Sequence, residues 1–491
     1  MKKAILASVS ILALLLYISC GKDDGPTDEP KAVEINSFSP PSGEVGTEVT
    51  ITGKNFSTTK TENSVSFNGT AATVKEASAS QLKVNVPSGA TTGPIKVTVG
   101  NNSATSTASF EVLAPEPTPA ITNISEGEWE WEDEITITGT DFSTTGNTVL
   151  INGVEAEIVE ENETHLKVIV PYGSRTGKIT VTRANNGTST ESSEDIIIYH
   201  GKWTEIAGFG AGIRRNAVAF VLDGTPYVGL GTDGTANSFK DFWEYNPSTD
   251  GWGEVAEVFS GDAHLGAVSF VIGDIAYVGT GILSGVAYPD FWKYSSEGWE
   301  GVNEANTRWL AVAFSIGNKG YIGTGLDENG DELKDFWEYD PSTGVWTQKA
   351  DLGGPARYSS VGFSIDGKGY IGGGNDPSEV YLKDFWEYDP ANNEWTQKAD
   401  IGGEQVSARG GATSFTLGEK GYVGLGRGED DNFLKDFWEY DPSADTWTRI
   451  ADFPGASRMW AVAFVVNGKA YVGTGYDENT LSDFWELDLG N

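Results

Sequence analysis

The sequence contains few of the residue types on which most enzymes and metalloproteins depend. Its 491 residues include one cysteine, three histidines and two methionines. A single cysteine cannot form a disulfide within the chain, and so few thiols and imidazoles leave little for a metal site. The sequence has no zinc motif, Ser/His/Asp arrangement, phosphate-binding loop or nucleotide fingerprint. The composition therefore disfavours the common catalytic classes.

Positive charge is also scarce. The chain has 33 Lys and Arg residues against 71 Asp and Glu, a net charge of −38. Nucleic acids and anionic membrane surfaces are polyanions and would repel such a chain. Hydrophobic residues make up 38% of the sequence and aromatic residues 11%, which is enough for packed cores, and the length indicates several domains. We therefore expect a soluble, folded, multidomain protein with no nucleic-acid partner.

The N-terminus carries a short apolar run that ends at the lone cysteine. Residues 4–19 (AILASVSILALLLYIS) follow Met1-Lys2-Lys3 and are too few to span a bilayer well, which is typical of a signal peptide over residues 1–19. The segment resembles a bacterial lipoprotein signal, although Tyr17 stands where the usual motif has Leu. The resemblance implies a lipid on Cys20, with residues 20–31 as anchor and linker. The alternative is an ordinary secretory signal with an incidental cysteine.

The segment after the cysteine bears on location. Gly21-Lys22-Asp23-Asp24 resembles the export signal that sends such lipoproteins to the outer leaflet of the outer membrane. The alternative is a solvated linker. We expect a protein held in the outer membrane by the lipid on Cys20 and facing outward.

Two segments, residues 32–113 and 119–199, repeat one pattern of short alternating strands. VTITGKNFSTT (49–59) matches ITITGTDFSTT (135–145), and LKVNVPSGATTG (82–93) matches LKVIVPYGSRTG (166–177). Alternating apolar residues between Gly, Asn and Pro turns indicate half-buried antiparallel strands in a sandwich. The sequence of both segments resembles the IPT/TIG family of immunoglobulin-like domains, and this resemblance implies a spacer or interaction module. The proline-rich segment 114–119 is a stiff linker between the copies.

Residues 201–491 contain a six-fold repeat marked by the triplet Asp-Phe-Trp. The triplets begin at Asp241, Asp290, Asp335, Asp384, Asp436 and Asp483, at spacings of 49, 45, 49, 52 and 47 residues. A period of ~50 residues with short β-rich segments is typical of a propeller. The Tyr-x6-Trp spacing after a Gly-rich strand resembles the kelch family, which implies four-stranded blades. The second repeat departs from that spacing, with four residues between Tyr294 and Trp299.

The two ends of this repeat region complement each other. Residues 202–205 have the pattern of a fourth strand with no third strand before it, and residues 483–489 have that of a third strand with no fourth after it. We expect the strand around Trp203 to complete the last blade, which leaves no unpaired edge. The predicted fold is all-β, with two immunoglobulin-like (IPT/TIG) sandwiches followed by a six-bladed kelch β-propeller.

Candidate binding residues lie in the segment that enters each innermost strand. Six residues before the Phe of that strand stand Arg214, His264, Arg308, Arg357, Arg409 and Arg458. Six such segments should surround one mouth of the central channel. Arg donates paired hydrogen bonds to carboxylates or hydroxyl pairs, and flat aromatics stack on sugar rings. The predicted ligand-binding residues are Arg214, Arg308, Trp309, Arg357, Tyr358, Arg409, Arg458 and Trp460, and we predict no catalytic residue, metal or cofactor.

The alternative for the arginines is a structural role. Asp233, Asp327, Asp376 and Asp477 stand two residues past the second strand on the same face, and Arg–Asp pairs there would tie blades together. Trp129 and Trp131 have two interpretations as well, a sugar platform or packing against the sandwich edge or the neighbouring domain. Asp327-x-Asn329-x-Asp331 imitates a calcium loop but lacks the Gly and Glu that such a loop needs.

The favoured function is a non-catalytic cell-surface binding protein for a carbohydrate. The expected partner is a glycan or a surface protein, and the expected state is a monomer. One alternative is a sugar mutarotase or epimerase, since the resemblance extends to the six-bladed bacterial sialic-acid mutarotases. Kelch-type copper oxidases are excluded because the propeller has one histidine, His264, and no cysteine. The other alternative is a protein-interaction scaffold or adhesin, which the unequal loops 325–333 and 426–434 would suit.

Overall fold

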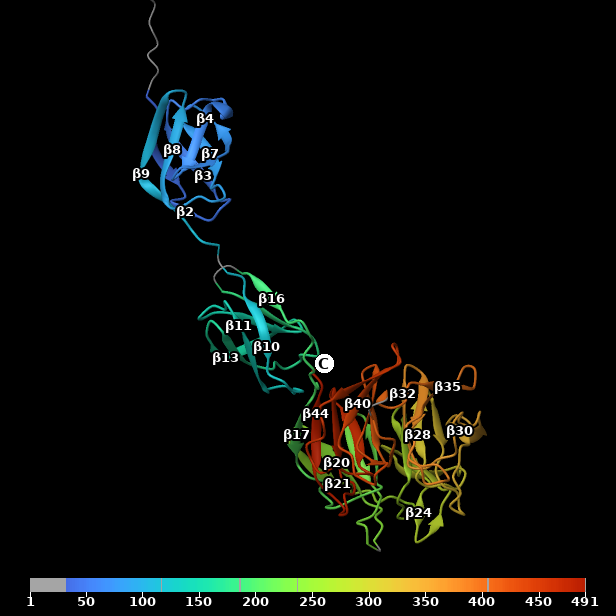
Figure 1. Cartoon of the computed structure of the whole chain (residues 1–491). Coiled ribbons are helices and arrows are strands. Elements are labelled where there is room, and N and C mark those ends of the chain that lie inside the picture. The colour runs from blue at the N-terminus through green and yellow to red at the C-terminus, as the bar shows by residue number, and fades with distance from the viewer. Residues whose placement is uncertain (1–31, 116, 185–186, 236, 404–405, 491) are drawn as a thin grey trace, which may run out of the picture. The chain divides into compact units, whose positions relative to one another are not determined.

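The computed structural model describes residues 32–490 except 116, 185–186, 236 and 404–405 (Figure 1). The predicted signal peptide and Cys20 lie outside the described residues. The structure describes a 3-10 turn, η1 (Lys60–Glu62), and no helix among the described residues is long and apolar enough to cross a membrane. The chain divides into two compact units, residues 1–117 and 118–491.

The first unit contains one immunoglobulin-like sandwich. One sheet has the order β1(Glu34–Ser39), β3(Glu48–Lys54), β7(Gln81–Asn85), β6(Val74–Ala77). The other has the order β2(Ser42–Gly43), β9(Asn102–Val112), β8(Gly93–Val99), β4(Asn63–Phe67), β5(Thr70–Ala72). Every second residue of β3 is buried, including Val49 and Ile51, because one face of each sheet packs on the other.

The second unit begins with a second sandwich of the same kind. Its strands follow the order β10(Ala120–Ile124), β11(Glu134–Thr140), β14(His165–Ile169), β13(Val154–Glu161), β12(Thr148–Ile151), β15(Ile179–Thr182), β16(Ser189–Glu191). Trp131 is 6% exposed and belongs to the core of this sandwich, where its Nε1 donates to the Ser174 carbonyl at 2.8 Å. Trp129 is half-buried and packs on the same core, so the packing interpretation of both tryptophans is confirmed.

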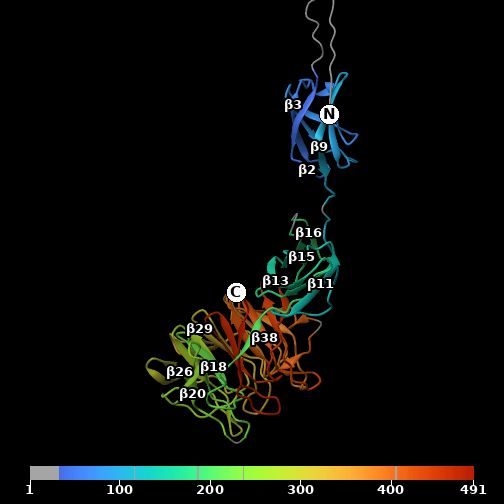
Figure 2. The ribbon, with the colours of Figure 1, turned by 90° about the vertical axis from the view of Figure 1, so that its left-hand side faces the viewer.

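The rest of the second unit, within its described residues, is a ring of six four-stranded sheets, numbered here as blades 1 to 6 (Figures 1 and 2). The inner strands are β18(Val218–Leu222), β22(Val268–Ile272), β28(Val312–Ile316), β32(Val361–Ile365), β37(Thr413–Leu417) and β42(Val462–Val466). The second strands are β19(Thr225–Gly229), β23(Ile275–Gly279), β29(Lys319–Gly323), β33(Lys368–Gly372), β38(Lys420–Gly424) and β43(Lys469–Gly473). The third strands are β20(Phe242–Asn246), β26(Phe291–Ser295), β30(Phe336–Asp340), β34(Phe385–Asp389), β40(Phe437–Asp441) and β44(Phe484–Asp488). The outer strands are β21(Gly251–Glu254), β27(Gly298–Val302), β31(Val345–Gln348), β35(Glu394–Lys398), β41(Thr446–Ile450) and β17(Lys202–Ile206).

The ring closes as the sequence predicts. Strand β17 pairs with β44 antiparallel, with Trp203 opposite Leu487 and Glu205 opposite Trp485. The first inner strand, β18, lies against both β22 and β42, so blade 1 follows blade 6 without a gap. Closure pairs strands from the two ends of the propeller and protects their edges.

Aromatic residues of the repeat pack one blade on the next. Phe336 of blade 3 lies 4.8 Å from the ring of Tyr388 and 5.0 Å from that of Trp395, both of blade 4. The Phe of the triplet therefore fills the space between the Tyr and Trp of the next repeat. Such pairs contribute about 0.5–1.5 kcal/mol each beyond the area they bury, which explains why both patterns recur together.

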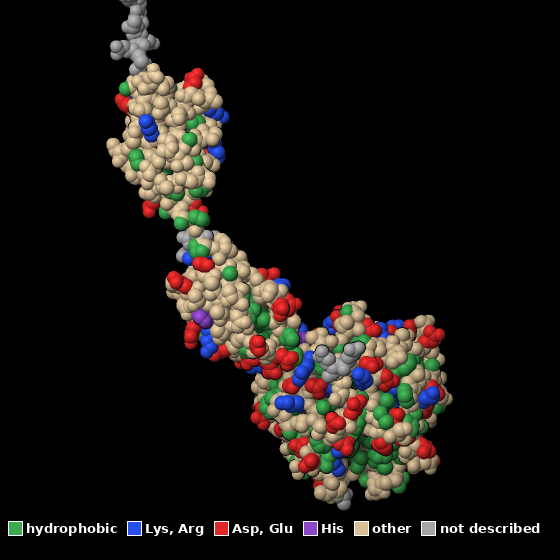
Figure 3. Space-filling view, viewed as in Figure 1, with side chains coloured by type: hydrophobic (Ala, Val, Ile, Leu, Met, Phe, Trp, Pro, Cys, Tyr) green, Lys and Arg blue, Asp and Glu red, His purple; other side chains and the backbone are tan. Residues whose placement is uncertain are grey.

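The propeller has two different ends. The loop face carries the connections from second to third strands and from outer strands to the next inner strand. Two short strand pairs lie in these connections: the hairpin of β24(Ile282–Leu283) with β25(Val286–Ala287), and β36(Arg409–Gly410) with β39(Arg427–Gly428), which joins one connection of each kind. The turn face carries the tight turns at the other ends of the strands. Figure 3 shows Asp and Glu scattered over the visible surface, as the net charge of −38 requires.

Candidate functional site

The five predicted arginines are buried inside the blades. Each is 0 or 1% exposed and pairs with the Asp of the Asp-Phe-Trp triplet in its own blade. The pairs and their N–O distances are Arg214–Asp241 at 2.9 Å, Arg308–Asp335 at 2.9 Å, Arg357–Asp384 at 2.6 Å, Arg409–Asp436 at 2.6 Å and Arg458–Asp483 at 2.7 Å. Each guanidinium also donates to the carbonyl of the residue that follows the second strand, as Arg308 does to Thr324 at 3.0 Å.

This geometry corrects two expectations. The carboxylate partner is the Asp of the triplet, not Asp233, Asp327, Asp376 or Asp477, because the guanidinium inserts between strands beneath the loops. The arginines also do not form an open cationic ring, since they are fully buried and already paired. A buried charge needs such a partner, and removing one partner costs about 3–5 kcal/mol. In this structure the five arginines hold their blades together.

The electrostatics of the pairs follow from this burial. Burial alone would raise the pKa of Asp335, but the hydrogen bond and charge of Arg308, with the indole N–H of Trp337, outweigh it and lower that pKa below its usual range. The pKa values of Asp241, Asp436 and Asp483 are lowered by the same balance. These carboxylates are therefore ionised acceptors and do not supply protons.

Blade 2 has histidine at the arginine position. His264 is fully buried, stacks on Tyr288 with ring centroids 4.8 Å apart, and has its Nδ1 3.7 Å from Oδ1 of Asp290. Neither ring nitrogen has a hydrogen-bond partner among the described residues. The imidazole is too short to repeat the contact that the arginines make.

A belt of backbone hydrogen bonds joins all six blades below the loop face. The glycine two residues past each second strand donates its N–H to the carbonyl of the Arg or His in the next blade, through Gly231, Gly281, Gly325, Gly374, Gly426 and Gly475. Gly325 has φ +92, and a Cβ there would lie 2.7 Å from the Trp309 carbonyl. This explains why glycine recurs at this position in all six blades. The bond from Gly475 to Arg214 carries the belt across the joint between blades 6 and 1.

A second ring of bonds lies closer to the channel mouth and is open at that joint. The residue two positions after each Arg or His has a positive φ, at Asn216, Gly266, Leu310, Ser359, Gly411 and Trp460. Each of the last five donates its N–H to the carbonyl of the preceding member, at 2.8–3.1 Å. No such bond runs from Asn216 to Trp460 among the described residues. The mouth is therefore less closed between blades 6 and 1 than elsewhere.

Arg215 occupies this open joint. Its guanidinium lies 4.4 Å from the ring centroid of Tyr476 and 5.6 Å from that of Trp460, within the range of cation–π contacts. Among the described residues no carboxylate lies within ion-pair distance of it. Arg215 Nε and Trp460 Nε1 have no hydrogen-bond partner there either. The stacked cation of Arg215 thus lies beside two buried donors, an arrangement that is rare in folded proteins.

The stack continues onto the loop of blade 5. Tyr476 contacts Phe433 at 5.8 Å, and the guanidinium of Arg427 lies 5.5 Å from the Phe433 ring. We call Arg215, Arg427, Phe433, Trp460 and Tyr476 the aromatic joint. Three blades contribute to it, and a carbohydrate site is usually built from such flat rings with a few polar groups.

Sequence reasoning found only Trp460 of these five residues. Arg215 follows Arg214 directly, and its place holds Leu, Trp, Tyr, Gly or Met in the other repeats. A cation at a position that is uncharged in the other five repeats could have indicated Arg215 as a candidate site residue. Tyr476, Phe433 and Arg427 lie in loops whose lengths differ between repeats, so the loop residues of one repeat cannot be aligned with those of another.

The other two predicted aromatic residues occupy, in blades 3 and 4, the repeat position that Arg215 has in blade 1. Trp309 and Tyr358 are half-buried, and each pairs through its backbone with the loop of its own blade. The Tyr358 hydroxyl donates to Glu379 at 2.7 Å, and burial together with that carboxylate raises the pKa of Tyr358. They extend the aromatic character of the loop face away from the joint.

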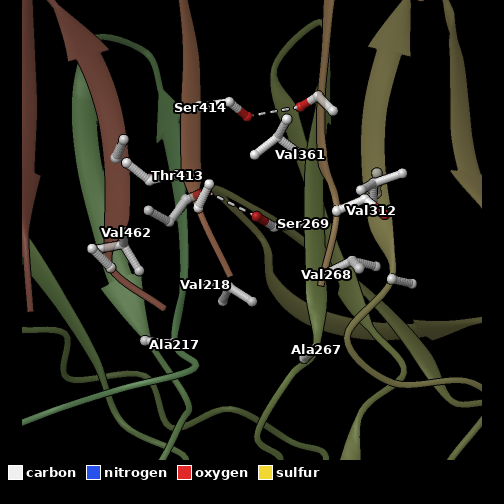
Figure 4. A pocket seen from close by; sticks show the side chains of 18 residues that line it. Ala217, Val218, Ala267, Val268, Ser269, Val312, Val361, Thr413, Ser414 and Val462 are labelled. Carbon is white, nitrogen blue, oxygen red and sulfur yellow. Dashed lines mark hydrogen bonds between the residues drawn. The ribbon is translucent and has the colours of Figure 1, made fainter. Parts of the chain in front are cut away.

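The central channel itself carries little chemistry. Figure 4 shows the small side chains that line it, among them Ala217, Val218, Ala267 and Ser269. The described lining residues are Ala, Val, Ser, Thr and Gly, and none is charged. Ser269 donates its hydroxyl to the Ala219 carbonyl of the neighbouring blade at 2.8 Å. Any recognition by polar groups therefore belongs to the rim.

Described groups that are typical of metal binding are also not gathered. No three or more His, Cys, Asp or Glu side chains of residues 32–490, gaps aside, are placed to hold a metal ion. In the loop of blade 3, Asp327 accepts the N–H groups of Asn329 and Asp331 at 2.7 and 2.9 Å. That carboxylate organises its own turn.

Comparison with known families agrees with the fold. The IPT/TIG domain model matches residues 33–112 and 119–195, and the KLHDC2/KLHL20/DRC7 Kelch-repeats domain model matches residues 302–458. The chain joins two IPT/TIG domains to a kelch-repeat propeller. The first and second IPT/TIG domains are called TIG1 and TIG2 below.

Curated relatives match segments of the chain. N-acetylneuraminate epimerase of Haemophilus influenzae (strain PittEE) is 47% identical over 62 residues, 13% of this chain and 16% of that protein. The Escherichia coli O157:H7 protein of that name is 29% identical over 154 residues, 30% of this chain and 38% of that protein. The chain thus spans less than half the length of these relatives. A solved structure titled "Structure of YjhT" is similar with a TM-score of 0.48 and 16% identity, over 57% of this chain and 96% of that one.

Proposed function

We propose that the kelch propeller binds a carbohydrate that carries a carboxylate, non-catalytically, at the aromatic joint. The observation that carries this proposal is Arg215, a cation stacked on two rings with no carboxylate partner among the described residues. Its guanidinium would bind the carboxylate, and the rings would pack on the sugar. The partial similarity to proteins named N-acetylneuraminate epimerase supports an acidic sugar as the ligand.

The same proposal includes the location. The lipoprotein-like signal ending at Cys20 supports a lipid anchor in the outer membrane, with both IPT/TIG domains between the anchor and the propeller. The protein would then present its loop face to glycans outside the cell. Labelling with a radioactive fatty acid tests the anchor, because a Cys20→Ala variant should take up no label.

A second candidate function is sugar mutarotation, which the names of the curated relatives favour. This chemistry needs only proton transfer, which groups at the rim can supply. It predicts that catalytic amounts of the protein accelerate anomer exchange of a sialic acid. A protein-interaction scaffold, the third possibility, predicts a protein partner and no sugar affinity.

The deciding experiment is a titration of the protein with N-acetylneuraminate and with sialylated glycans, followed by ligand-observed NMR. Arg215→Gln should weaken binding about tenfold to a hundredfold, because a hydrogen bond to a charged group contributes about 1.5–3 kcal/mol. Lys368→Gln on the turn face, where Lys368 pairs with Asp389, is the matched control and should bind as the wild type does.

Each outcome has a distinct meaning. No binding to any acidic sugar by folded protein would contradict the proposed function. Binding that survives Arg215→Gln unchanged would move the site away from the aromatic joint. Accelerated anomer exchange in the same NMR samples would replace the non-catalytic proposal with mutarotation.

A further inference from the structure

TIG2 and the propeller meet without a spacer. His200 ends TIG2, and β17 begins two residues later, at Lys202. The carbonyl of His200 accepts the N–H of Ala451 at 3.1 Å, and the Ala451 carbonyl accepts the indole N–H of Trp203. The closing strand of the ring is therefore held at its start by blade 5.

A buried polar cluster lies at this meeting point. His200 is 2% exposed, and its Nε2 lies 3.2 Å from Oε2 of Glu439 in strand β40. The same carboxylate accepts the Tyr422 hydroxyl at 2.7 Å and lies 3.9 Å from Arg175 of TIG2. A second cation also joins the two domains, since Arg449 of blade 5 lies 4.7 Å from the ring centroid of Tyr199.

The chain end adds a third contact. The Tyr172 hydroxyl faces Asp488 at the end of β44, and that carboxylate, with burial, raises the pKa of Tyr172. Tyr172 packs at a tilt on Trp131, with ring centroids 4.5 Å apart, and a ring atom of Trp131 lies 2.9 Å from where a Cβ of Gly490 would be. In both views the C-terminus lies beside this sandwich (Figures 1 and 2).

The contacting residues distinguish the two sandwiches. In the matched segments, Tyr172 and Arg175 of LKVIVPYGSRTG correspond to Ser88 and Thr91 of LKVNVPSGATTG. Trp131 precedes ITITG by the same interval at which Val45, 52% exposed, precedes VTITG. TIG2 therefore has a large or cationic residue at each of three places where TIG1 has a small or aliphatic one.

We propose that TIG2 is a dedicated docking domain for the propeller, held on blades 5 and 6 by Tyr172, Arg175 and His200. Residues 118–491 then unfold and move as one body, as their division into a single compact unit supports. The contacts to Asp488 and Gly490 lie at the turn-face end of β44, whereas Asp483 begins that strand at the loop face.

The test replaces contact residues of TIG2 by the residues that stand at the matching positions of TIG1. In the full chain, Tyr172→Ser with Arg175→Thr should speed protease cleavage around residues 199–202 at least tenfold. It should also split the calorimetric transition of residues 118–491 into two. The substituted loop occurs in TIG1 within the same fold, so TIG2 itself should stay folded. The matched control, Ser88→Tyr with Thr91→Arg in TIG1, should leave cleavage at 199–202 unchanged.

A double-mutant cycle of Tyr172→Phe and Asp488→Asn provides a second measurement with smaller changes. Each single variant should accelerate cleavage, and the double variant should be no faster than the faster single one. Wild-type cleavage rates and one transition in the Ser/Thr variant would overturn the proposal. Fully independent effects in the cycle would also contradict it.

Discussion

Blade 2 differs from the other blades at three places. It has His264 where the other five have a paired arginine and an uncharged hairpin β24–β25 where their loops carry acidic residues, and its turn before Trp299 is shorter than the matching turns of blades 1, 3, 4 and 5. Its four strands nevertheless pair in the same order and register as those of the other blades. The sheet therefore does not depend on the Arg–Asp pair, which instead locks the loop side of a blade once the sheet exists.

The same comparison separates scaffold from site. The arginine that recurs in five blades, such as Arg357, is buried, and the glycine that recurs in all six, such as Gly325, belongs to the belt. The aromatic joint consists of residues that do not recur, such as Arg215 and Phe433. In a repeat protein the departures from the repeat are thus the better guide to a binding site.

The largest expected effect comes from giving blade 4 the residue of blade 2. Arg357→His should lower the free energy of unfolding by about 3–5 kcal/mol, because Asp384 would keep its buried charge without the guanidinium. Urea unfolding monitored by tryptophan fluorescence measures this change. A loss below about 1 kcal/mol would show that the pairs are as dispensable in blade 4 as in blade 2.

Acid should weaken blades 1, 3, 5 and 6. The pKa values of Asp241, Asp335, Asp436 and Asp483 are lowered in the folded state, so the unfolded chain binds protons first as the pH falls. Their stabilisation is full above the ordinary value of 3.8 and is lost as the pH falls through the lower folded values. Urea midpoints measured from pH ~6 to pH ~2 should fall across this window. Asp335→Asn should flatten the dependence, and an unchanged slope would contradict this cause.

The smallest expected effect is an increase in stability. His264→Arg would give blade 2 the partner that Asp290 lacks, and should raise the free energy of unfolding by about 1 kcal/mol. Differential scanning calorimetry against wild type measures it. A lower transition temperature would instead show that Tyr288, which stacks on His264, has taken the space of the guanidinium.

Much of the fold could be predicted because the repeat is regular. The triplet spacing and the complementary ends at Trp203 and residues 483–489 predicted six blades and the closing strand, and the structure confirms both. The partner of the arginines could not be predicted. Two aspartates recur at fixed distances after each of several arginines, such as Asp327 and Asp335 after Arg308, and spacing alone cannot say which one lies beneath the loop.

The sequence by itself determined the periodicity, the alternation of buried residues and the aromatic pairs that stack blade on blade, because these depend on contacts within one repeat or between neighbours. Only the tertiary structure decided which charges are buried and which side chains meet at the aromatic joint. Arg215 and Trp460 come together because ring closure brings blade 1 against blade 6. The contact of His200 with Glu439 has the same cause, since residues 239 apart in the chain meet only when the ring and its docked sandwich are assembled.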